Sequence, residues 1–293
     1  MSGFEAAAQA RSWLFAPGDS QKKMTRAVAS AADIVVIDLE DAVADAEKPA
    51  ARVLVADFLR AHADQAARLW VRINPIQSPH ALLDLVAMVP ARPGGLMLPK
   101  PRGRADVELL GHYLTALEVA NGTRPGATAL ILVTTETPQG MLATATYAGL
   151  PRIAAMTWGA EDIATALGAT TNREADGSYA YTYQLAQTLC LIGAGVAGVP
   201  AIETIHANFR DDAGLIVVAD RVRRNGFRGM LAIHPAQVDP INAAFSPSME
   251  ECAQAREVVA LFAANPTLGT IGHNGAMLDR PHLMRAQAIL ARA

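Results

Sequence analysis

Eight short apolar runs recur along the chain, each followed by polar or turn-forming residues and separated from the next by an amphipathic segment. These runs are SWLFAPG, DIVVIDLE, RLWVRINP, GLMLPKP, ALILVTTETP, RIAAMTWGAED, VPAIETI and GMLAIHP, which start near residues 12, 33, 68, 95, 129, 152, 199 and 229. Apolar runs of this length bounded by turn residues predict buried β-strands. Helical spacing is found in residues 49–66, 104–120 and 211–225. The pattern predicts strands and helices in alternation.

Continuously hydrophobic strands that alternate with helices are typical of a parallel sheet covered on both faces. Eight such units match the count of an α/β (β/α)8 TIM barrel. A doubly wound open sheet is the alternative, but nothing like GxGxxG follows the first strand. The segment GAGVAG at 193–198 fits that motif only loosely and ends a predicted helix instead of starting one. We therefore expect a barrel domain over residues 1–235.

Residues 236–293 exceed what eight units need and predict a C-terminal helical extension. The segment FSPSMEECAQAREVVALFAA predicts a helix capped by Ser246 or Ser248, with Pro247 near its first turn. NPTLGTIGHNGAMLD is expected to form a loop, and RPHLMRAQAILARA a last helix. The extension either covers the barrel or acts as a lid that contributes residues to a site in its own or a neighbouring subunit.

The composition is that of a soluble globular protein, because 51% of the residues are hydrophobic and 18% are charged. The formal net charge of −3 offers no basic field of the kind that binds nucleic acid, so a phosphate-bearing ligand would need a local basic patch. Cys190 and Cys252 are isolated in helical stretches, without CxxC spacing, which favours buried, reduced thiols.

Targeting and membrane signals are not apparent in the sequence. The first residues, MSGFEAAAQARSW, lack a basic region followed by a long apolar one, and no apolar run reaches the ~18 residues of a membrane span. We expect a cytoplasmic protein that does not bind a membrane.

Polar residues gather where the predicted strands end, which is the edge at which TIM barrels carry their active sites. Glu136 and Asp162 close the fifth and sixth strands, which are neighbours in a barrel, so their carboxylates can converge. Two carboxylates with positions left for water and ligand suit a hard cation such as Mg²⁺. Each also lies near the start of a helix, where capping by the helix dipole is the alternative explanation.

Two further side chains at the same edge are candidates for catalysis. Arg72 ends the third strand and could stabilise a carboxylate or a developing enolate oxygen, or it could form a salt bridge to Glu40 or Asp41 in the barrel mouth. His234 precedes Pro235 at the eighth strand, where a lone histidine more often belongs to the scaffold than acts as acid or base.

The loop after the first strand carries Lys22, Lys23 and Arg26 within one or two helical turns. A solvated helical face accounts for them, and a contact with nucleotide phosphates is the alternative.

Nine motifs in order resemble one known family. They are RSWLFAPGD, DIVVIDLEDAVADAEKPAAR, VRIN, LMLPK, ETPQG, WGAEDIATALGA, GFRGMLAIHPAQV, NAAFSPS and MLDRPHLMRAQAIL, which run from Arg11 to about Leu290. Together they are similar to the citrate lyase beta subunit group of the HpcH/HpaI aldolase family, which includes malyl-CoA and citramalyl-CoA lyases. This chain departs from the group in having Glu203 where many relatives have aspartate.

The resemblance implies a (β/α)8 barrel that binds Mg²⁺ and cleaves or forms a carbon–carbon bond next to an acyl thioester. It implies that Glu136 and Asp162 are the metal ligands and that Arg72 faces the substrate. It also implies that Asp279 reaches into an adjacent subunit's site, which would make the extension a shared lid in a homotrimer or hexamer. Asp279 is then the candidate general acid or base, with water or Glu40 as the fallback.

The three carboxylates Asp38, Glu40 and Asp41 also lie at this edge. Side chains alternate in direction along a strand, so all three are not expected to face one ion. We expect Glu40 and Asp41 to orient metal-bound water or Arg72, and Asp38 to be structural.

We expect a Mg²⁺-dependent lyase that acts on a short 3-hydroxyacyl-CoA such as malyl-CoA, citramalyl-CoA or citryl-CoA. One alternative is the beta subunit of a multi-subunit citrate lyase, in which alpha and acyl-carrier subunits are the partners and the thioester is carried on a partner protein. A second is a non-catalytic barrel that binds a thioester or a dicarboxylate.

Overall fold

The computed structural model describes residues 1–292. Residues Met1–Asn242 form one compact unit, and a second unit begins at Ala243. The first contains the barrel and the cavity described below, and Asp279 lies in the second.

Eight parallel strands form the barrel, in the spatial order β6-β5-β4-β3-β2-β1-β8-β7. A bridge between Met156 and Ala201 joins the two ends of this order. The strands are β1 (Ser12–Pro17), β2 (Ile34–Asp38), β3 (Leu69–Arg72), β4 (Gly95–Leu98), β5 (Ala129–Val133), β6 (Ile153–Thr157), β7 (Ile202–Glu203) and β8 (Gly229–Ala232). The predicted (β/α)8 TIM barrel is confirmed.

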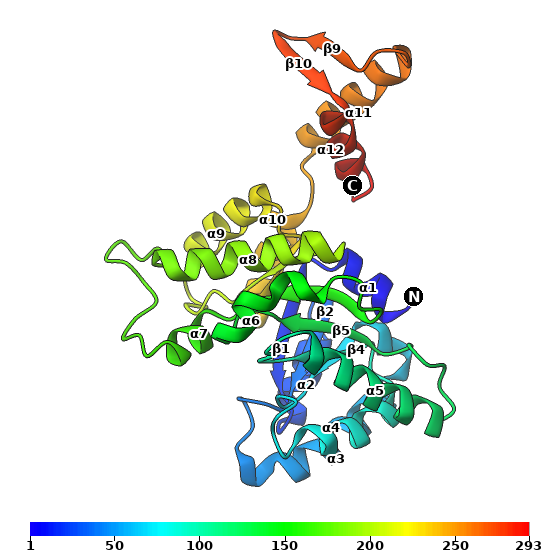
Figure 1. The fold of residues 1–293 in the computed structure, drawn as a ribbon, viewed down its shortest axis with the longest axis vertical. Helices are drawn as coiled ribbons and strands as arrows, with labels where there is room; N and C mark the ends of the chain where they lie inside the picture. The colour runs from blue at the N-terminus through cyan, green and yellow to red at the C-terminus, as the bar shows by residue number, and fades with distance from the viewer. Residues whose placement is uncertain (293) are drawn as a thin grey trace. The chain divides into compact units, whose positions relative to one another are not determined.

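Helices follow the strands and surround them (Figure 1). In the barrel unit they are α1 (Gly3–Gln9), α2 (Gln21–Val28), α3 (Lys48–Ala61), α4 (Ala81–Met88), α5 (Arg104–Ala120), α6 (Pro138–Ala143), α7 (Ala160–Ala166), α8 (Tyr181–Ala197), α9 (Asp212–Asn225) and the start of α10 (Val238–Phe245). Short 3-10 helices lie at η1 (Asp45–Glu47), η2 (Ala63–Arg68), η3 (Val89–Ala91), η4 (Thr144–Tyr147) and η5 (Pro235–Gln237).

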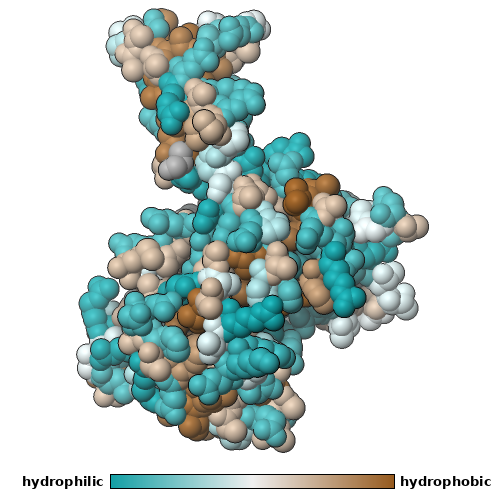
Figure 2. All heavy atoms as spheres, turned by 180° about the vertical axis from the view of Figure 1, so that it is seen from behind, coloured by the Kyte–Doolittle hydropathy of each residue, from teal (hydrophilic) through white to brown (hydrophobic). Residues whose placement is uncertain are grey.

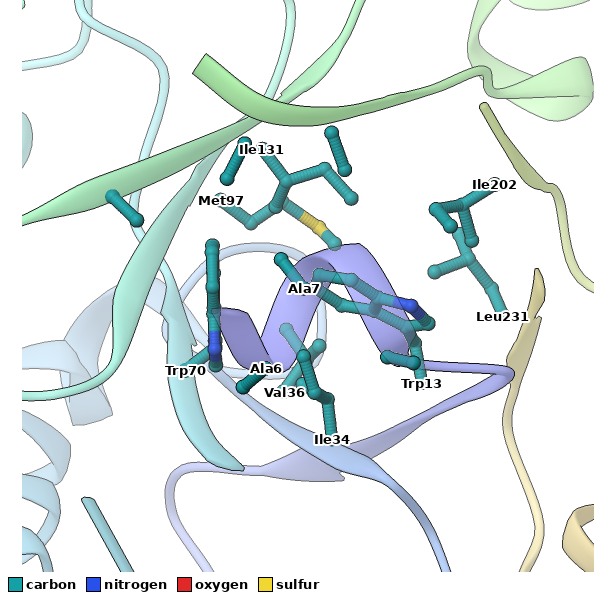
Figure 3. Packing of buried hydrophobic residues seen from close by; sticks show 14 of the residues in the cluster. Ala6, Ala7, Trp13, Ile34, Val36, Trp70, Met97, Ile131, Ile202 and Leu231 are labelled. Carbon is teal, nitrogen blue, oxygen red and sulfur yellow. The ribbon is translucent and has the colours of Figure 1, made fainter. Parts of the chain in front are cut away.

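Side chains from helix α1 and from the barrel strands fill the barrel core. Trp13 of β1 and Trp70 of β3 meet edge to face with their ring centroids 5.2 Å apart. Ala6 and Ala7 of α1 pack against the same cluster, and Figure 3 shows this helix beside the two tryptophans. Small side chains on α1 let it close the N-terminal end of the barrel, which leaves the C-terminal end for the site.

Local sequence signals fix where the helices near the site begin. The Ser20 hydroxyl accepts a hydrogen bond from the Lys23 amide at the start of α2. The Thr137 hydroxyl does the same for the Gly140 amide at α6, where Pro138 occupies the first turn. These caps hold the turns directly after β1 and β5.

The second unit contains two helices joined by a β-hairpin. It consists of the end of α10, α11 (Met249–Ala264), β9 (Thr270–His273), β10 (Ala276–Asp279) and α12 (Arg280–Leu290). Of the two predicted caps for α11, Ser248 is the one observed, in a capping box with Glu251, and Pro247 precedes it. The expectation of a plain loop over NPTLGTIGHNGAMLD is wrong, because β9 and β10 pair antiparallel within it.

Cys190 and Cys252 are both free and buried, as their spacing predicts. Hydrophobic and hydrophilic residues are interspersed on the face of the barrel unit seen in Figure 2. Within residues 1–292, no helix is long and apolar enough to cross a bilayer.

Candidate active site

The C-terminal ends of the strands surround a cavity of about 460 Å³. Its polar side contains carboxylates and one guanidinium, and its other side is mostly apolar. The lining residues are Phe15, Pro17, Asp38, Asp41, Ala42, Arg72, Met97, Val133, Glu136, Trp158, Gly159, Ala160, Glu161, Asp162, Tyr179, Thr204, Ile205, Ala207, Leu231 and Ile233. Of the predicted site residues, Arg72, Asp41, Glu136 and Asp162 line this cavity.

Arg72 forms ion pairs with the carboxylates that follow β2. Its Nε and one terminal nitrogen bond the two oxygens of Asp38 at 2.8 and 2.6 Å, and its other terminal nitrogen lies 2.9 Å from Glu40 Oε2. The register makes this possible, because Asp38 and Arg72 are direct neighbours on β2 and β3. Burial raises the pKa of Asp38, but the Arg72 guanidinium outweighs this effect and holds the pKa below its usual range. Asp38 therefore stays ionised and fixes the guanidinium plane.

Lys100 is a site residue that sequence reasoning did not select. Its Nζ lies 2.6 Å from Glu40 Oε1, 3.1 Å from Asp162 Oδ1 and 3.5 Å from Asp41 Oδ2. Its backbone has a φ of +52°, and its amide donates to Glu136 Oε2 at 2.8 Å. The signal in the sequence was Pro99-Lys100 at the end of the fourth strand, but a left-handed lysine backbone cannot be read from residue type. Lys100 links the acidic end of β2 to both proposed metal ligands.

Glu136 is almost completely buried, with 4% of its surface exposed. Burial raises its pKa well above the usual range, and the neighbouring Asp162 and Glu40 carboxylates raise it further. Gly159 is required beside it, since a Cβ at that position would lie 2.6 Å from Glu136 Cγ. The positive charges of Arg72 and Lys100 therefore do not offset the burial of Glu136 and its repulsion by the neighbouring carboxylates.

Glu40 and Asp41 differ in their surroundings. Burial raises the pKa of Glu40 to about 7, although Arg72 and Lys100 both oppose that rise. Asp41 has 58% of its side chain exposed and lies 3.7 Å from Arg72. Both side chains lie near the two cations of the site, and their role in orienting metal-bound water or Arg72 stays a prediction.

The donor set fits a hard divalent cation. Five carboxylates, those of Asp38, Glu40, Asp41, Glu136 and Asp162, share the two cations Arg72 and Lys100. An additional cation among them would relieve the repulsion that raises the pKa of Glu136. Within residues 1–292, no three His, Cys, Asp or Glu side chains are arranged so that they could bind one metal ion together. Glu136 and Asp162 would thus supply two ligands and leave the others to water and substrate.

The remaining sequence candidates lie outside the cavity lining. Lys22, Lys23 and Arg26 are exposed on α2, after the strand end at Pro17. His234 accepts a hydrogen bond from the Ala236 amide through Nδ1 and stacks on Phe209, which is a scaffold role.

Asp279 belongs to the second unit, where it caps α12. It accepts hydrogen bonds from the His282 amide and lies 2.6 Å from His282 Nδ1. The bond to His282 lowers the pKa of Asp279. A third of the Asp279 side chain is exposed.

An aromatic wall closes the cavity on the side of β6. The buried Trp158 meets Tyr179 edge to face, with their ring centroids 5.1 Å apart. The Arg173 guanidinium lies over the Tyr179 ring, 3.5 Å from its centroid. Behind this wall, the Trp158 Nε1 donates to Glu203 Oε1 at 2.8 Å and Gln187 donates to Oε2 at 2.7 Å. Burial raises the pKa of Glu203 to about 7. Glu203 fixes the indole and is itself absent from the cavity lining.

Comparison with known proteins gives a family and several full-length relatives. A model of the HpcH/HpaI aldolase/citrate lyase family matches residues 11–235. The citrate lyase subunit beta-like protein of Mycobacterium tuberculosis is 34% identical over 282 residues, which cover 96% of this chain and 94% of that protein. The citrate lyase subunit beta of Haemophilus influenzae is 32% identical and the (3S)-malyl-CoA thioesterase of Cereibacter sphaeroides 32%, each covering 97% of this chain and 96% or 94% of the relative.

Solved structures agree with these relatives. The protein CitE from Mycobacterium tuberculosis, in complex with magnesium, acetoacetate and coenzyme A, matches with a TM-score of 0.79 and 31% identity over 98% of this chain and 99% of that one. The citrate lyase beta subunit from the same organism, complexed with oxaloacetate and magnesium, matches with a TM-score of 0.72 and 31% identity over 83% and 100% of the two chains.

Proposed function

This chain belongs to the HpcH/HpaI aldolase/citrate lyase family, and we propose that it is a Mg²⁺-dependent carbon–carbon lyase. Its substrate would be a short 3-hydroxyacyl-CoA such as malyl-CoA, citramalyl-CoA or citryl-CoA. The observation that carries this proposal is the meeting of Glu136 and Asp162 with Arg72 at one cavity. The magnesium and coenzyme A in the complex of the similar CitE protein support it.

The reaction needs charge stabilisation at two places and the movement of two protons. A base takes the proton of the substrate hydroxyl, that oxygen becomes a carbonyl, and the C2–C3 bond breaks. Its electron pair forms the enolate of the thioester, which takes a proton at C2 to give an acetyl thioester and a 2-oxo acid. Magnesium, when bound, supplies a Lewis acid for the hydroxyl and carboxylate oxygens.

The side chains take separate parts in this scheme. Glu136 and Asp162 would hold the metal, while Arg72 lines the cavity and has N–H groups left for the enolate oxygen after its bonds to Asp38 and Glu40. One such preorganised donor contributes on the order of 3 kcal/mol to the transition state. Asp279 of a neighbouring subunit would move the protons, with Glu40 or water as the fallback. This role for Asp279 requires a homotrimer or hexamer in which the second unit is a shared lid.

The nucleotide end of the substrate would lie outside the cavity. Lys22, Lys23 and Arg26 are exposed on the helix that follows β1, so their positive charges are free to approach phosphates at the same end of the barrel.

Other activities in the family give different products. A relative named (3S)-malyl-CoA thioesterase would release free coenzyme A, and relatives named citrate lyase subunit beta suggest that alpha and acyl-carrier subunits could be partners. A non-catalytic binding barrel would release nothing. The lyase is favoured because a binder has no use for two metal carboxylates together with a partly buried arginine on one cavity.

The metal assignment is tested by titrating Mg²⁺ into purified protein in a calorimeter. Glu136→Ala and Asp162→Ala should each weaken binding by about 100-fold or more and abolish turnover, because each removes one of two protein ligands. Glu108→Ala is the matched control, since that carboxylate is exposed on α5 and pairs only at the surface with Arg104. Unchanged Mg²⁺ binding in either site variant would remove the metal assignment.

A further inference from the structure

Besides its charged groups, the cavity has an apolar floor, and the Arg72 guanidinium lies next to it, 4.9 Å from the Phe15 ring centroid. Met97 of β4, Val133 of β5 and Leu231 of β8 line it from the barrel interior, and each is less than 5% exposed. The same three residues belong to the core cluster on which Phe15 and Ile205 pack, and Figure 3 shows Met97 and Leu231 within that core. The floor, made of Met97, Val133 and Leu231, is therefore the part of the barrel core that faces the cavity.

Both cations of the site, Arg72 and Lys100, already form ion pairs with its carboxylates. Among the described residues that line the cavity, Arg72 alone is cationic, and it already contacts Asp38 and Glu40. Lys100 contacts Glu40 and Asp162 and does not line the cavity. The lining also includes five carboxylates, those of Asp38, Asp41, Glu136, Glu161 and Asp162.

These two features restrict the substituent on the carbon that becomes the 2-oxo group. If the proposed function holds, the hydroxyl and carboxylate on this carbon face Glu136 and Asp162, and the thioester oxygen takes the N–H groups left on Arg72. The third substituent then has the apolar floor as its surroundings. A second carboxylate there would be desolvated next to groups of its own charge, and Arg72, the one cation of the described lining, already pairs with Asp38 and Glu40.

We infer that this site selects 3-hydroxyacyl thioesters whose 2-oxo acid half carries only hydrogen or a short alkyl group, and discriminates against those with a second carboxylate. The inference rests on the proposed function for the orientation of the substrate. Malyl-CoA and citramalyl-CoA, which release glyoxylate and pyruvate, satisfy it, whereas citryl-CoA, which releases oxaloacetate, does not.

The first test compares citramalyl-CoA with citryl-CoA as substrates of the full-length protein with Mg²⁺. We expect kcat/KM to be about 100-fold higher for citramalyl-CoA, the magnitude expected for burying an unpaired charge. Equal or faster cleavage of citryl-CoA would overturn the inference while leaving the lyase function intact. Cleavage of neither of these thioesters, nor of malyl-CoA, would overturn the proposed function.

A binding measurement decides the inference without turnover. In calorimetry with Mg²⁺ present, pyruvate and 2-oxobutanoate should bind more tightly than oxaloacetate. Tighter binding of oxaloacetate, or no binding of any 2-oxo acid, would contradict the inference.

A variant tests the floor itself. Ile205 is half-buried and lines the cavity, so Ile205→Arg should supply the missing cation and narrow the ratio between citramalyl-CoA and citryl-CoA at least tenfold, which corresponds to about 1.4 kcal/mol. Ile216→Arg is the control, because Ile216 is 49% exposed on α9 outside the cavity, and it should leave the ratio unchanged. An unaltered ratio in a folded Ile205→Arg protein would show that the substituent lies elsewhere. If that variant does not fold, the wild-type substrate and 2-oxo acid series decide the question.

Discussion

Hydrogen bonds from buried polar residues hold the loop that carries Glu40 and Asp41. Asp84 is fully buried and accepts hydrogen bonds from Arg52 Nε at 2.6 Å and from the backbone and side-chain nitrogens of Asn74 at 2.8 and 2.7 Å. Asn74 in turn accepts from Lys48, whose Nζ also donates to the carbonyls of Leu39 and Glu40. The position of the acidic loop therefore depends on one carboxylate that does not touch the cavity.

Removing that carboxylate should destabilise the protein strongly. Asp84→Ala leaves Arg52 buried without its partner, so the free energy of unfolding should fall by about 3–5 kcal/mol, as measured by urea denaturation. Asp57→Ala, which breaks the exposed pair with Arg60, should cost less than about 1 kcal/mol. Similar losses in the two variants would show that the network does not hold the loop.

At this scale the sequence predicted which residues reach the cavity better than it predicted how they are held. Arg72, Glu136 and Asp162 follow from one rule, that polar residues at the ends of barrel strands face the site. The sequence did not predict the roles of Lys100 and Asp84, because these roles come from contacts between segments that are distant in the chain. Lys100 reaches Glu40 over 60 positions in the chain, and Asp84 is buried in α4, a helix whose other residues are all apolar.

Helix α5 is joined to the strands beside the site by a second buried ion pair. Glu118, at the end of α5, takes two hydrogen bonds from the guanidinium of Arg152 at 2.8 and 2.7 Å. Burial alone would raise the pKa of Glu118, but the hydrogen bonds from Arg152 and from the amides of Thr128 and Gly126 outweigh it and lower the pKa to about 2. The pair connects α5 to the residues preceding β5 and β6.

This pair should appear in the pH dependence of stability. The folded pKa lies below the ordinary value of 4.5, so the unfolded chain binds more protons between these two values. The contribution of Glu118, about 3 kcal/mol, is therefore fully present above pH 4.5 and is lost as the pH falls through about 2. Urea unfolding from pH 2 to pH 6 should show a flatter profile for Glu118→Gln than for the wild type. Glu108→Gln, on the exposed side of α5, should reproduce the wild-type slope, and parallel profiles for all three proteins would contradict the pKa assignment.

Hydrophobic periodicity predicted the barrel strands well and missed the C-terminal hairpin. The predicted strand starts at residues 12, 95, 129 and 229 coincide with those of β1, β4, β5 and β8, and the predicted helix 104–120 is α5. The β9–β10 hairpin was missed because both strands are short, with little hydrophobic alternation, and β9 contains a glycine. Its turn did carry a local signal, since Asn274 and Gly275 adopt φ values of +46° and +76°, which is the backbone that Asn-Gly favours in a two-residue hairpin loop.

At the scale of the whole molecule, the proposed site needs two copies of the chain. Arg72 belongs to the barrel unit and Asp279 to the second unit, and the proposed shared lid takes them from different subunits. In an equal mixture of Arg72→Ala and Asp279→Asn proteins, some sites would combine the intact residue of each. After verified subunit exchange, about one quarter of wild-type turnover should return, from two proteins that are each almost inactive. No recovery would count against a shared site and leave the fold and the metal assignment untouched.

Carbon–carbon cleavage that depends on Mg²⁺ is the central claim, and the products of the reaction test it most directly. Malyl-CoA, citramalyl-CoA and citryl-CoA should each be incubated with the purified protein, with Mg²⁺ or with a chelator, and the products identified by mass spectrometry. We expect equal amounts of acetyl-CoA and a 2-oxo acid from at least one substrate, only when Mg²⁺ is present. Free coenzyme A with the hydroxy acid intact, or no product from any of the three, would contradict it.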